Sequence, residues 1–205
     1  MIFPVWRQQL VRSLHLHRSK AEAKYFQVAS VGSDGSPKLR TMVFRGFEQN
    51  SNVLLATSDA RSEKISEWTK LAKAELHWYF VKTREQYRIA CDVSVIRQHA
   101  DDSIVGARKE HSQVATDHTE LYESVWKQLS KNAQQSFFCT PPKSTITDEF
   151  VPDEPKPTNI SPYFALVCFI PVAVDYVDLK TVPHTRTIFT LNTHDNKWSS
   201  TAVNP

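Results

Sequence analysis

The sequence predicts a mainly β protein in which antiparallel strands form a small barrel with helices packed outside it. Strand-like runs rich in β-branched and aromatic residues follow one another closely, and turn residues such as Asp34-Gly35 separate them. These runs lie at about 24–32, 37–47, 52–58, 74–82 and 84–96. Their close succession predicts an antiparallel meander. The run from Glu75 to Val81 is apolar on both faces, so we expect both sides of it to be covered.

Helical spacing of apolar residues marks the segments before, within and after this meander. Val5 to Arg18 predicts a first helix, because Trp6, Leu10 and Leu14 recur at helical spacing and cations follow at its end. A short helix at about 61–71 interrupts the strands, and a longer one is expected at about 117–135. The last strands, at about 163–179, 185–192 and 196–202, are expected to return to the barrel.

The chain of 205 residues is expected to form a single domain, 1–205, long enough to bury roughly 70% of its unfolded surface. A stretch at about 140–162 contains six of the eleven prolines. We interpret it as an extended loop inside the domain, because the segment after it is too short to fold alone. The widely spaced Cys91, Cys139 and Cys168 favour free thiols in a reducing compartment, with the first and last buried in strands.

Composition argues against several classes of protein. A net charge of +3, from 25 basic and 22 acidic residues, is too small and too evenly mixed to indicate nucleic acid as a partner. No apolar run reaches the length of about 18 residues that a membrane span needs, and the N-terminus lacks a signal-peptide pattern, so we expect a cytoplasmic protein without a membrane partner. The histidines lack metal-ligand spacing, and the glycines form neither a dinucleotide-binding nor a P-loop motif.

Cations and hydroxyls gather in two nearby runs, which is the most informative feature of the chain. The first, from Arg40 to Phe47, has the composition of a strand; the second, from Thr57 to Lys64, is typical of a strand end that turns into a helix with a Ser/Asp N-cap. A helix start offers unpaired N–H groups and the positive end of the macrodipole, so Arg61, Ser62 and Lys64 in the first turn favour a dianion. We therefore predict a pocket for a phosphate group.

The spacing of these runs resembles the FMN site of the pyridoxamine 5'-phosphate oxidase-like split-barrel flavoproteins, and most closely an oxidase-related FMN-binding branch of that family. The resemblance covers most of the chain and includes the Arg-x-x-x-x-Arg strand at 40–45, the Ser-x-Lys helix start at 62–64 and the run Arg-Glu-Gln-Tyr-Arg-Ile at 84–89. It implies an antiparallel split β-barrel, FMN as the cofactor, and a homodimer with the flavin at the seam between subunits.

By this resemblance, Arg40 and Lys64 would hold the FMN phosphate and Gln86 would reach the flavin ring. Arg61 would supply a charge that is missing at Glu63, where the oxidases place an Arg. The implied cofactor-binding residues are Arg40, Thr41, Met42, Val43, Thr57, Arg61, Ser62, Lys64 and Gln86. Such a set meets what FMN requires, namely cations for its phosphate, hydroxyls or amides for the ribityl chain and backbone groups beside the ring.

The resemblance also implies a substrate side, formed by Arg45, His184 and Arg186. Arg40 and Arg45 are five residues apart, so in a regular strand they would point to opposite faces and would not hold the same phosphate. The oxidases carry a Trp after an aromatic residue near the C-terminus; here Tyr176 is followed by Val177 and Asp178, so an aliphatic or an acidic residue replaces the Trp. No Arg occurs in the helix ending at Gln135 to hold a substrate phosphate, so a vitamin B6 phosphate as substrate is left open.

Alternative functions follow from these departures. The first hypothesis is an FMN-dependent oxidoreductase acting on a small substrate, with vitamin B6 phosphates as the most probable named class. The second is a non-catalytic flavin-binding or flavin-sensing protein that kept the cofactor pocket. The third is a haem-binding relative, which would need an axial ligand from His77, His184 or His194. Catalytic residues are not identified by any of these patterns.

Overall fold

The structure is a computed structural model in which residues 3–98, 104–105, 118–145 and 159–205 are described. The Pro-rich loop expected at 140–162 therefore falls mostly outside the described residues. The helices are α1 (Val5–Leu16), α2 (Glu63–Lys70), α3 (His118–Gln128) and α4 (Lys131–Gln135), with short 3₁₀ turns η1 (Ala21–Lys24) and η2 (Ser136–Phe138). The strands are β1 (Tyr25–Val31), β2 (Pro37–Val43), β3 (Gly46–Phe47), β4 (Leu54–Asp59), β5 (Lys73–Phe80), β6 (Glu85–Ile96), β7 (Ile104–Val105), β8 (Phe164–Asp178), β9 (Thr185–Asn192) and β10 (Lys197–Val203).

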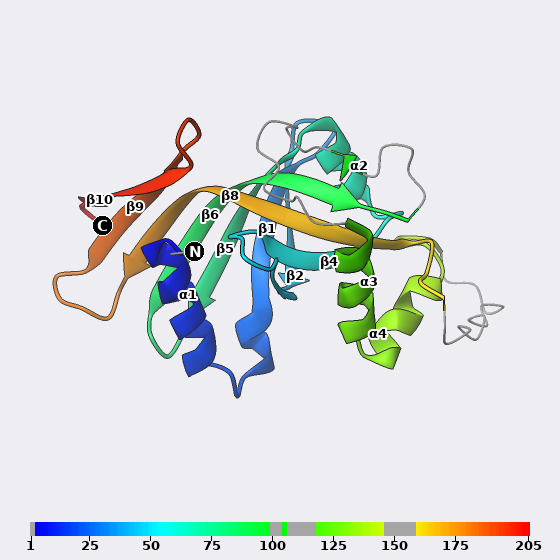
Figure 1. The fold of residues 1–205 in the computed structure, drawn as a ribbon, viewed down its shortest axis with the longest axis horizontal. Helices are drawn as coiled ribbons and strands as arrows, with labels where there is room; N and C mark the ends of the chain where they lie inside the picture. The colour runs from blue at the N-terminus through cyan, green and yellow to red at the C-terminus, as the bar shows by residue number, and fades with distance from the viewer. Residues whose placement is uncertain (1–2, 99–103, 106–117, 146–158) are drawn as a thin grey trace.

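All of these strands join one antiparallel sheet in the order β10-β9-β8-β6-β5-β1-β2, with β3, β4 and β7 off this path. The long β8 crosses the molecule, β9 and β10 extend it at one end, and α3 and α4 lie at the other (Figure 1). β6 pairs along one edge of β8, while β4 and β9 share the other edge. The predicted barrel of antiparallel strands with outer helices is confirmed. The predicted meander is wrong at β4, because β4 pairs with β3 and β8 but not with β5, and β5 pairs with β1 instead.

The core has two parts that meet at β8. Its larger part holds Trp6 of α1, Trp68 of α2 and Trp78 of β5, each fully buried against the inner face of the sheet. Its smaller part packs Tyr122 and Trp126 of α3 against the other face of β8. The first half of β8 is therefore buried on both faces, which explains why its sequence is continuously apolar rather than alternating.

The outer face of β5 is not covered, contrary to the expectation for residues 75–81. Burial alternates along this strand, and Tyr79 keeps 43% of its surface exposed while Val81, just after the strand, keeps 75%. On the same face of the sheet, Tyr25 of β1 and Leu39 of β2 are 45% and 70% exposed. Large apolar side chains thus remain uncovered on one face of the sheet.

Side chains of α1 contact a buried carboxylate at the start of β6. Glu85 at the start of β6 is 1% exposed and accepts hydrogen bonds from Ser13 Oγ at 2.6 Å and Tyr176 Oη at 2.8 Å. Arg12 of α1 forms an ion pair with the same carboxylate. Because a buried carboxylate is costly unless it is fully paired, this cluster fixes how α1 lies on the sheet.

Several local predictions can be compared with the structure directly. The helix expected at 117–135 is two helices, since Ser130 begins α4 by accepting a hydrogen bond from the Ala133 N–H. Cys91 and Cys168 are buried free thiols, as predicted. None of the described helices is both long and apolar enough to span a membrane.

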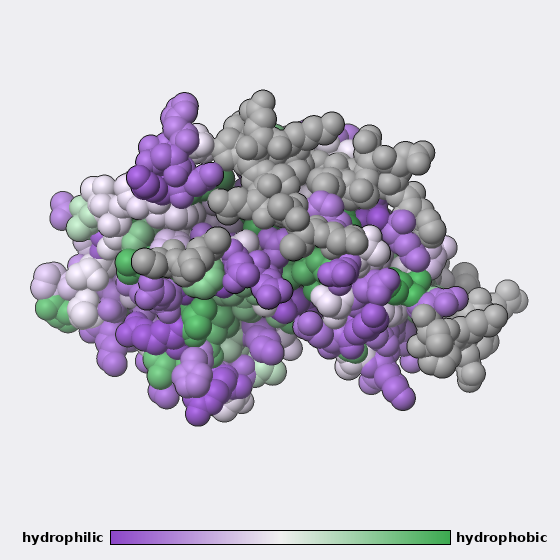
Figure 2. Space-filling model, viewed as in Figure 1, coloured by the Kyte–Doolittle hydropathy of each residue, from purple (hydrophilic) through white to green (hydrophobic). Residues whose placement is uncertain are grey.

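In the view of Figure 1, the surface is mostly hydrophilic, with hydrophobic residues gathered beside α1 (Figure 2).

Candidate functional site

The ends of β2 and β4, the first turn of α2 and the segment around α4 enclose a pocket of about 450 Å³, called here the Lys64 pocket. Of the predicted cofactor and substrate residues, the lining contains Arg40, Thr41, Met42, Val43, Arg45, Thr57 and Lys64. Ser58, Asp59, Ala133, Ser136, Phe137, Thr140 and Pro142 complete it. The two sequence runs that predicted a phosphate site are therefore brought together in space.

Lys64 is held in this pocket by serine hydroxyls rather than by a carboxylate. Its Nζ donates hydrogen bonds to Ser62 Oγ at 2.7 Å and Ser58 Oγ at 3.1 Å, and no carboxylate lies within ion-pair distance of it among the described residues. Burial, and then the nearby positive charge of Arg40, lower the pKa of Lys64 below its ordinary value. A partly desolvated ammonium beside another cation is a site that an anion would stabilise.

Arg40 is held by groups on β1, β2 and α2. Its Nη2 donates to Glu67 Oε2 at 2.8 Å, and its Nη1 donates to Ser30 Oγ and to the Val28 carbonyl. Glu67 is only 6% exposed and also accepts a hydrogen bond from Ser30 Oγ. The Arg40 guanidinium is thus held at the wall of the pocket, and the buried carboxylate of Glu67 is its ion-pair partner.

Arg45 lies in the same pocket as Arg40, which corrects the alternation argument. That argument assumed one regular strand, but β2 ends at Val43, and the chain changes direction before β3 begins at the positive-φ residue Gly46. Burial lowers the pKa of Arg45, and its Nε is buried without a hydrogen-bond partner among the described residues. Arg45 also has no ion-pair partner among the described residues, so its positive charge favours an anion or an acceptor group in the pocket that it lines.

Arg61 and Ser62 do not line the pocket. Arg61 donates to both carboxylate oxygens of Asp59, at 3.0 and 2.6 Å, and to the Cys139 carbonyl at 2.9 Å, and it lies over the Tyr163 ring. The expectation that Arg61 replaces the charge missing at Glu63 is therefore not supported by its placement. Ser62 occupies the N-cap position of α2 without a side-chain cap bond; its Oγ accepts the Lys64 hydrogen bond instead.

Gln86 lies on the exposed face of the sheet, outside the Lys64 pocket of its own chain. Its Oε1 is 3.4 Å from His77 Nε2, and His77 Nδ1 is 3.1 Å from Gln27 Oε1. Thr41 pairs with Gln27 across β1 and β2, so these polar side chains run in a row from the edge of the pocket across the open face.

His184 and Arg186 also lie away from the Lys64 pocket of their own chain. His184 is exposed in the β8–β9 turn, where its Nδ1 is 2.8 Å from the Thr181 carbonyl oxygen. Arg186 on β9 donates to both oxygens of Asp175, at 2.9 and 2.7 Å. His194 is exposed in the β9–β10 turn, so none of the three histidines considered for haem lines the pocket.

Sequence reasoning missed two contributions to this site. Ser136 and Thr140 reach the pocket from a segment that is about 70 residues beyond α2, and no motif in that segment indicated a ligand. Glu67 was also missed, although a Glu three residues after Lys64 on a short amphipathic helix could have been examined as a partner for a strand Arg.

Chemically, the pocket is suited to an anionic group with an extended body. Its lining combines three cations, Arg40, Arg45 and Lys64, with hydroxyl side chains and with the β2 segment from Thr41 to Val43. No cluster of three or more potential metal ligands occurs in the described parts of the chain. Buried Cys91 is a poor nucleophile, because burial raises the pKa of its thiol well above the ordinary value.

Comparison with known proteins agrees with this geometry. Residues 3–97 match the family described as "Pyridoxamine 5'-phosphate oxidase, FMN-binding domain". Over 206 residues the chain is 31% identical to the pyridoxine/pyridoxamine 5'-phosphate oxidase 2 of Arabidopsis thaliana, covering 98% of this chain and 96% of that protein. The chain belongs to the pyridoxamine 5'-phosphate oxidase family of FMN-binding proteins. The predicted family is thereby confirmed.

Solved structures of the family share its architecture with this chain. A pyridoxamine 5'-phosphate oxidase-related, FMN-binding protein from Nostoc punctiforme is 33% identical, with a TM-score of 0.88 and complete coverage of both chains. PhzG from Burkholderia lata, solved with tetrahydrophenazine-1-carboxylic acid, is 16% identical with a TM-score of 0.68 and shows the shared fold only. The mainly antiparallel split-barrel fold predicted from the sequence is confirmed by the likeness to the Nostoc punctiforme protein.

Proposed function

We propose that this chain is an FMN-dependent oxidoreductase that binds the FMN phosphate in the Lys64 pocket and works as a homodimer. The observation that carries the proposal is Lys64 itself, a half-buried ammonium beside a second cation, whose hydrogen-bond partners in the part of the chain that the structure describes are two serine hydroxyls. A phosphate dianion would supply the negative charge that this arrangement lacks. Membership of an FMN-binding family supports FMN as the compound that brings this phosphate.

In this proposal, the residues divide the cofactor between them. Lys64 and Arg40 hold the phosphate, Thr57 offers a hydroxyl to the ribityl chain, and the backbone of Thr41 to Val43 lies along the ring. FMN, when bound, supplies the hydride-accepting chemistry. The protein then contributes position and electrostatics, and the positive charge of Arg45 in the pocket lining would attract an acceptor group of a small substrate.

A second subunit is proposed to cover the open face of the sheet. Tyr25, Leu39 and Tyr79 leave apolar surface exposed there, and the row from Thr41 to Gln86 leads across the same face. His184 and Arg186 lie too far along the sheet to reach the Lys64 pocket of their own chain, and we infer that they approach the pocket of the partner. Gln86 would reach the flavin of the partner in the same way.

The absorption spectrum of the purified protein, loaded with FMN and then gel-filtered, tests the cofactor assignment. We expect flavin bands at one FMN per chain. A Soret band, or complete loss of FMN on the column, would contradict the proposal. Turnover with pyridoxine 5'-phosphate and pyridoxamine 5'-phosphate then tests vitamin B6 phosphates as the substrate class, with the dephosphorylated compounds as controls.

A non-catalytic flavin-binding protein is a second candidate, and one observation favours it. Arg186, the residue proposed to meet substrate, has its guanidinium engaged by both oxygens of Asp175, which is 14% exposed. FMN binding at full stoichiometry, without reduction of the flavin by any B6 phosphate under anaerobic conditions, would favour this second function.

A further inference from the structure

The segment 136–143, called here the strap, supplies one wall of the Lys64 pocket. Its residues Phe137, Thr140 and Pro142 belong to the pocket lining, which Lys64 joins from the first turn of α2. A phosphate bound at Lys64 would therefore lie beside the strap.

The strap begins at a point that is fixed in the core. Phe137 is buried, and the centroid of its ring lies 5.8 Å from that of Trp126 and 5.2 Å from that of Phe164. Ser161 Oγ donates a hydrogen bond to the Phe137 carbonyl at 2.9 Å. Residues 140–143 are exposed, so core packing of this kind does not hold them against the pocket.

Two side chains at the start of α2 reach the strap. Arg61 Nη2 donates a hydrogen bond to the Cys139 carbonyl at 2.9 Å, while both oxygens of Asp59 fix the guanidinium. Glu63 Oε2 accepts a hydrogen bond from Lys143 Nζ at 2.5 Å. The Arg61 side chain is 19% exposed and that of Glu63 is 62% exposed, so the first contact is expected to be the stronger one and the second to depend on salt.

Lys143 occupies a backbone position that suits lysine poorly. It follows Pro142 in a turn that the Ser144 N–H closes on the Pro141 carbonyl at 3.2 Å, and its φ is 68°. Glycine or asparagine is favoured at such a position after a proline. Neither of those residues could reach Glu63 with a positive charge, so the ion pair, rather than the turn, accounts for a lysine here.

We propose that Arg61 and Glu63 are positioning residues that hold the strap closed beside the phosphate at Lys64 and so slow its release. This inference rests on the proposed function, because it takes the phosphate of FMN as the ligand. Neither residue belongs to the pocket lining, which separates their role from that of Lys64. Release from such a pocket requires its wall to open, so the contacts that hold the wall influence the dissociation rate.

Cleavage by trypsin after Lys143 measures how often the strap opens, because the rate follows the population of the open form. Arg61→Lys keeps a positive charge beside Asp59 but replaces the planar fork by a single ammonium. Loss of the hydrogen bond to the Cys139 carbonyl should speed this cleavage about tenfold. FMN should slow the cleavage in the wild type, and riboflavin, which lacks the phosphate, should slow it much less.

The rate of FMN release, followed by the return of flavin fluorescence after dilution, tests the effect on the ligand. Arg61→Lys should release FMN about tenfold faster than the wild type. Glu63→Gln should release it about twofold faster, as expected for loss of an exposed ion pair. Charge alone predicts the opposite for Glu63→Gln, since this substitution removes a negative charge near the phosphate.

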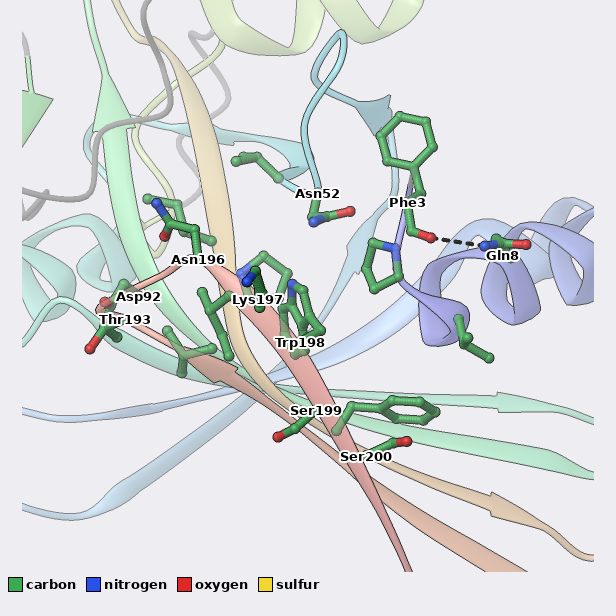
Figure 3. A pocket seen from close by; sticks show the side chains of 18 of the residues that line it. Phe3, Gln8, Asn52, Asp92, Thr193, Asn196, Lys197, Trp198, Ser199 and Ser200 are labelled. Atoms are coloured by element: carbon green, nitrogen blue, oxygen red, sulfur yellow. Dashed lines mark hydrogen bonds between the residues drawn. The ribbon is translucent and has the colours of Figure 1, made fainter. Parts of the chain in front are cut away.

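Two controls separate opening of the strap from a general loosening of the fold. Arg18→Lys is the same substitution at an exposed arginine whose hydrogen bonds go to His15, and it should behave as the wild type. A second cavity, of about 780 Å³ and lined by Lys197 and Trp198 of β10, shares no lining residue with the Lys64 pocket (Figure 3). Cleavage after Lys197 should therefore proceed at the same rate in the wild type and in both strap variants.

The outcomes distinguish this inference from the proposed function. If the wild type binds FMN but FMN does not protect Lys143 from cleavage, or if Arg61→Lys releases FMN at the wild-type rate, the inference alone is overturned. Equal acceleration of cleavage after Lys143 and Lys197 would overturn it as well, because the fold as a whole would then have loosened. A wild type that binds no FMN overturns the proposed function, and this inference with it.

Discussion

Lys64→Met is the most direct test of the proposed phosphate site. Methionine keeps much of the length and the apolar stem of lysine but removes the ammonium that donates to Ser58 and Ser62. A charge-assisted hydrogen bond in a partly desolvated pocket contributes roughly 1.5–3 kcal/mol, which corresponds to about a ten- to hundredfold loss of FMN affinity. Riboflavin lacks the phosphate, so its affinity should change little.

Quenching of flavin fluorescence, measured for FMN and riboflavin in parallel, gives both dissociation constants. Lys70→Met is the matched control, because Lys70 lies in the exposed last turn of the same helix and should leave both affinities unchanged. If Lys64→Met weakens riboflavin as much as FMN, the change has damaged the pocket in general and the phosphate assignment is refuted. Unchanged FMN affinity would refute it as well.

Further predictions concern the neighbouring groups, pH and assembly. Arg40→Ala should also lower the affinity for FMN, by about tenfold or more, while changing the affinity for riboflavin little. The same substitution should leave the buried carboxylate of Glu67 without its ion-pair partner and so lower the melting temperature. Burial and the charge of Arg40 lower the pKa of Lys64, so the affinity for FMN should begin to fall at a lower alkaline pH than the pKa of an ordinary lysine would give. In Lys64→Met the affinity for FMN should not change over the same alkaline range. A wild-type affinity that does not change with pH in this range would contradict the prediction. Burial alone would raise the pKa of Glu85, but hydrogen bonds from Ser13 and Tyr176 and the charge of Arg12 lower it below its usual value. The stability that this cluster contributes is therefore fully present above the unfolded-state pKa of Glu85 and is lost as the pH falls through its folded-state pKa. Glu85→Gln should lower the melting temperature at neutral pH, and the melting temperature of this variant should fall less steeply in acid than that of the wild type. If subunits close the flavin site, dilution should release FMN and excess FMN should raise the melting temperature; a sedimenting monomer that binds FMN with undiminished affinity would exclude this.

Local features of the chain were predicted well because their causes are local. The strand expected at 185–192 has those bounds in the structure, and the strands near 24–32 and 84–96 differ only by a residue or so at their ends. Side-chain alternation and turn chemistry act over a few residues, so they can be read without knowing the fold. The cation-rich runs at Arg40 and Lys64 were also recognisable, since their residue types and spacing are short-range properties.

The tertiary structure decided what each cation does. Arg61, just before the N-cap of α2, and Lys64, in its first turn, are three residues apart. Arg61 is nevertheless bound to Asp59 and the Cys139 carbonyl, while Lys64 lines the pocket. Arg45 lines the same pocket as Arg40 because strand β2 ends at Val43, and the alternation of side chains along a regular strand does not predict where a strand ends. Burial and partners determine whether a charge is available to a ligand, and both depend on segments far apart in the chain.

By itself, the sequence determined the family, the antiparallel strands and the residue types of a phosphate pocket, because these follow from short-range patterns. Only the tertiary structure decided that β4 pairs with β8 and that Glu67 holds Arg40. Each of these depends on contacts between residues at least 20 positions apart in the chain. The free energy of such contacts comes from packing and desolvation of the folded chain, which no local pattern specifies.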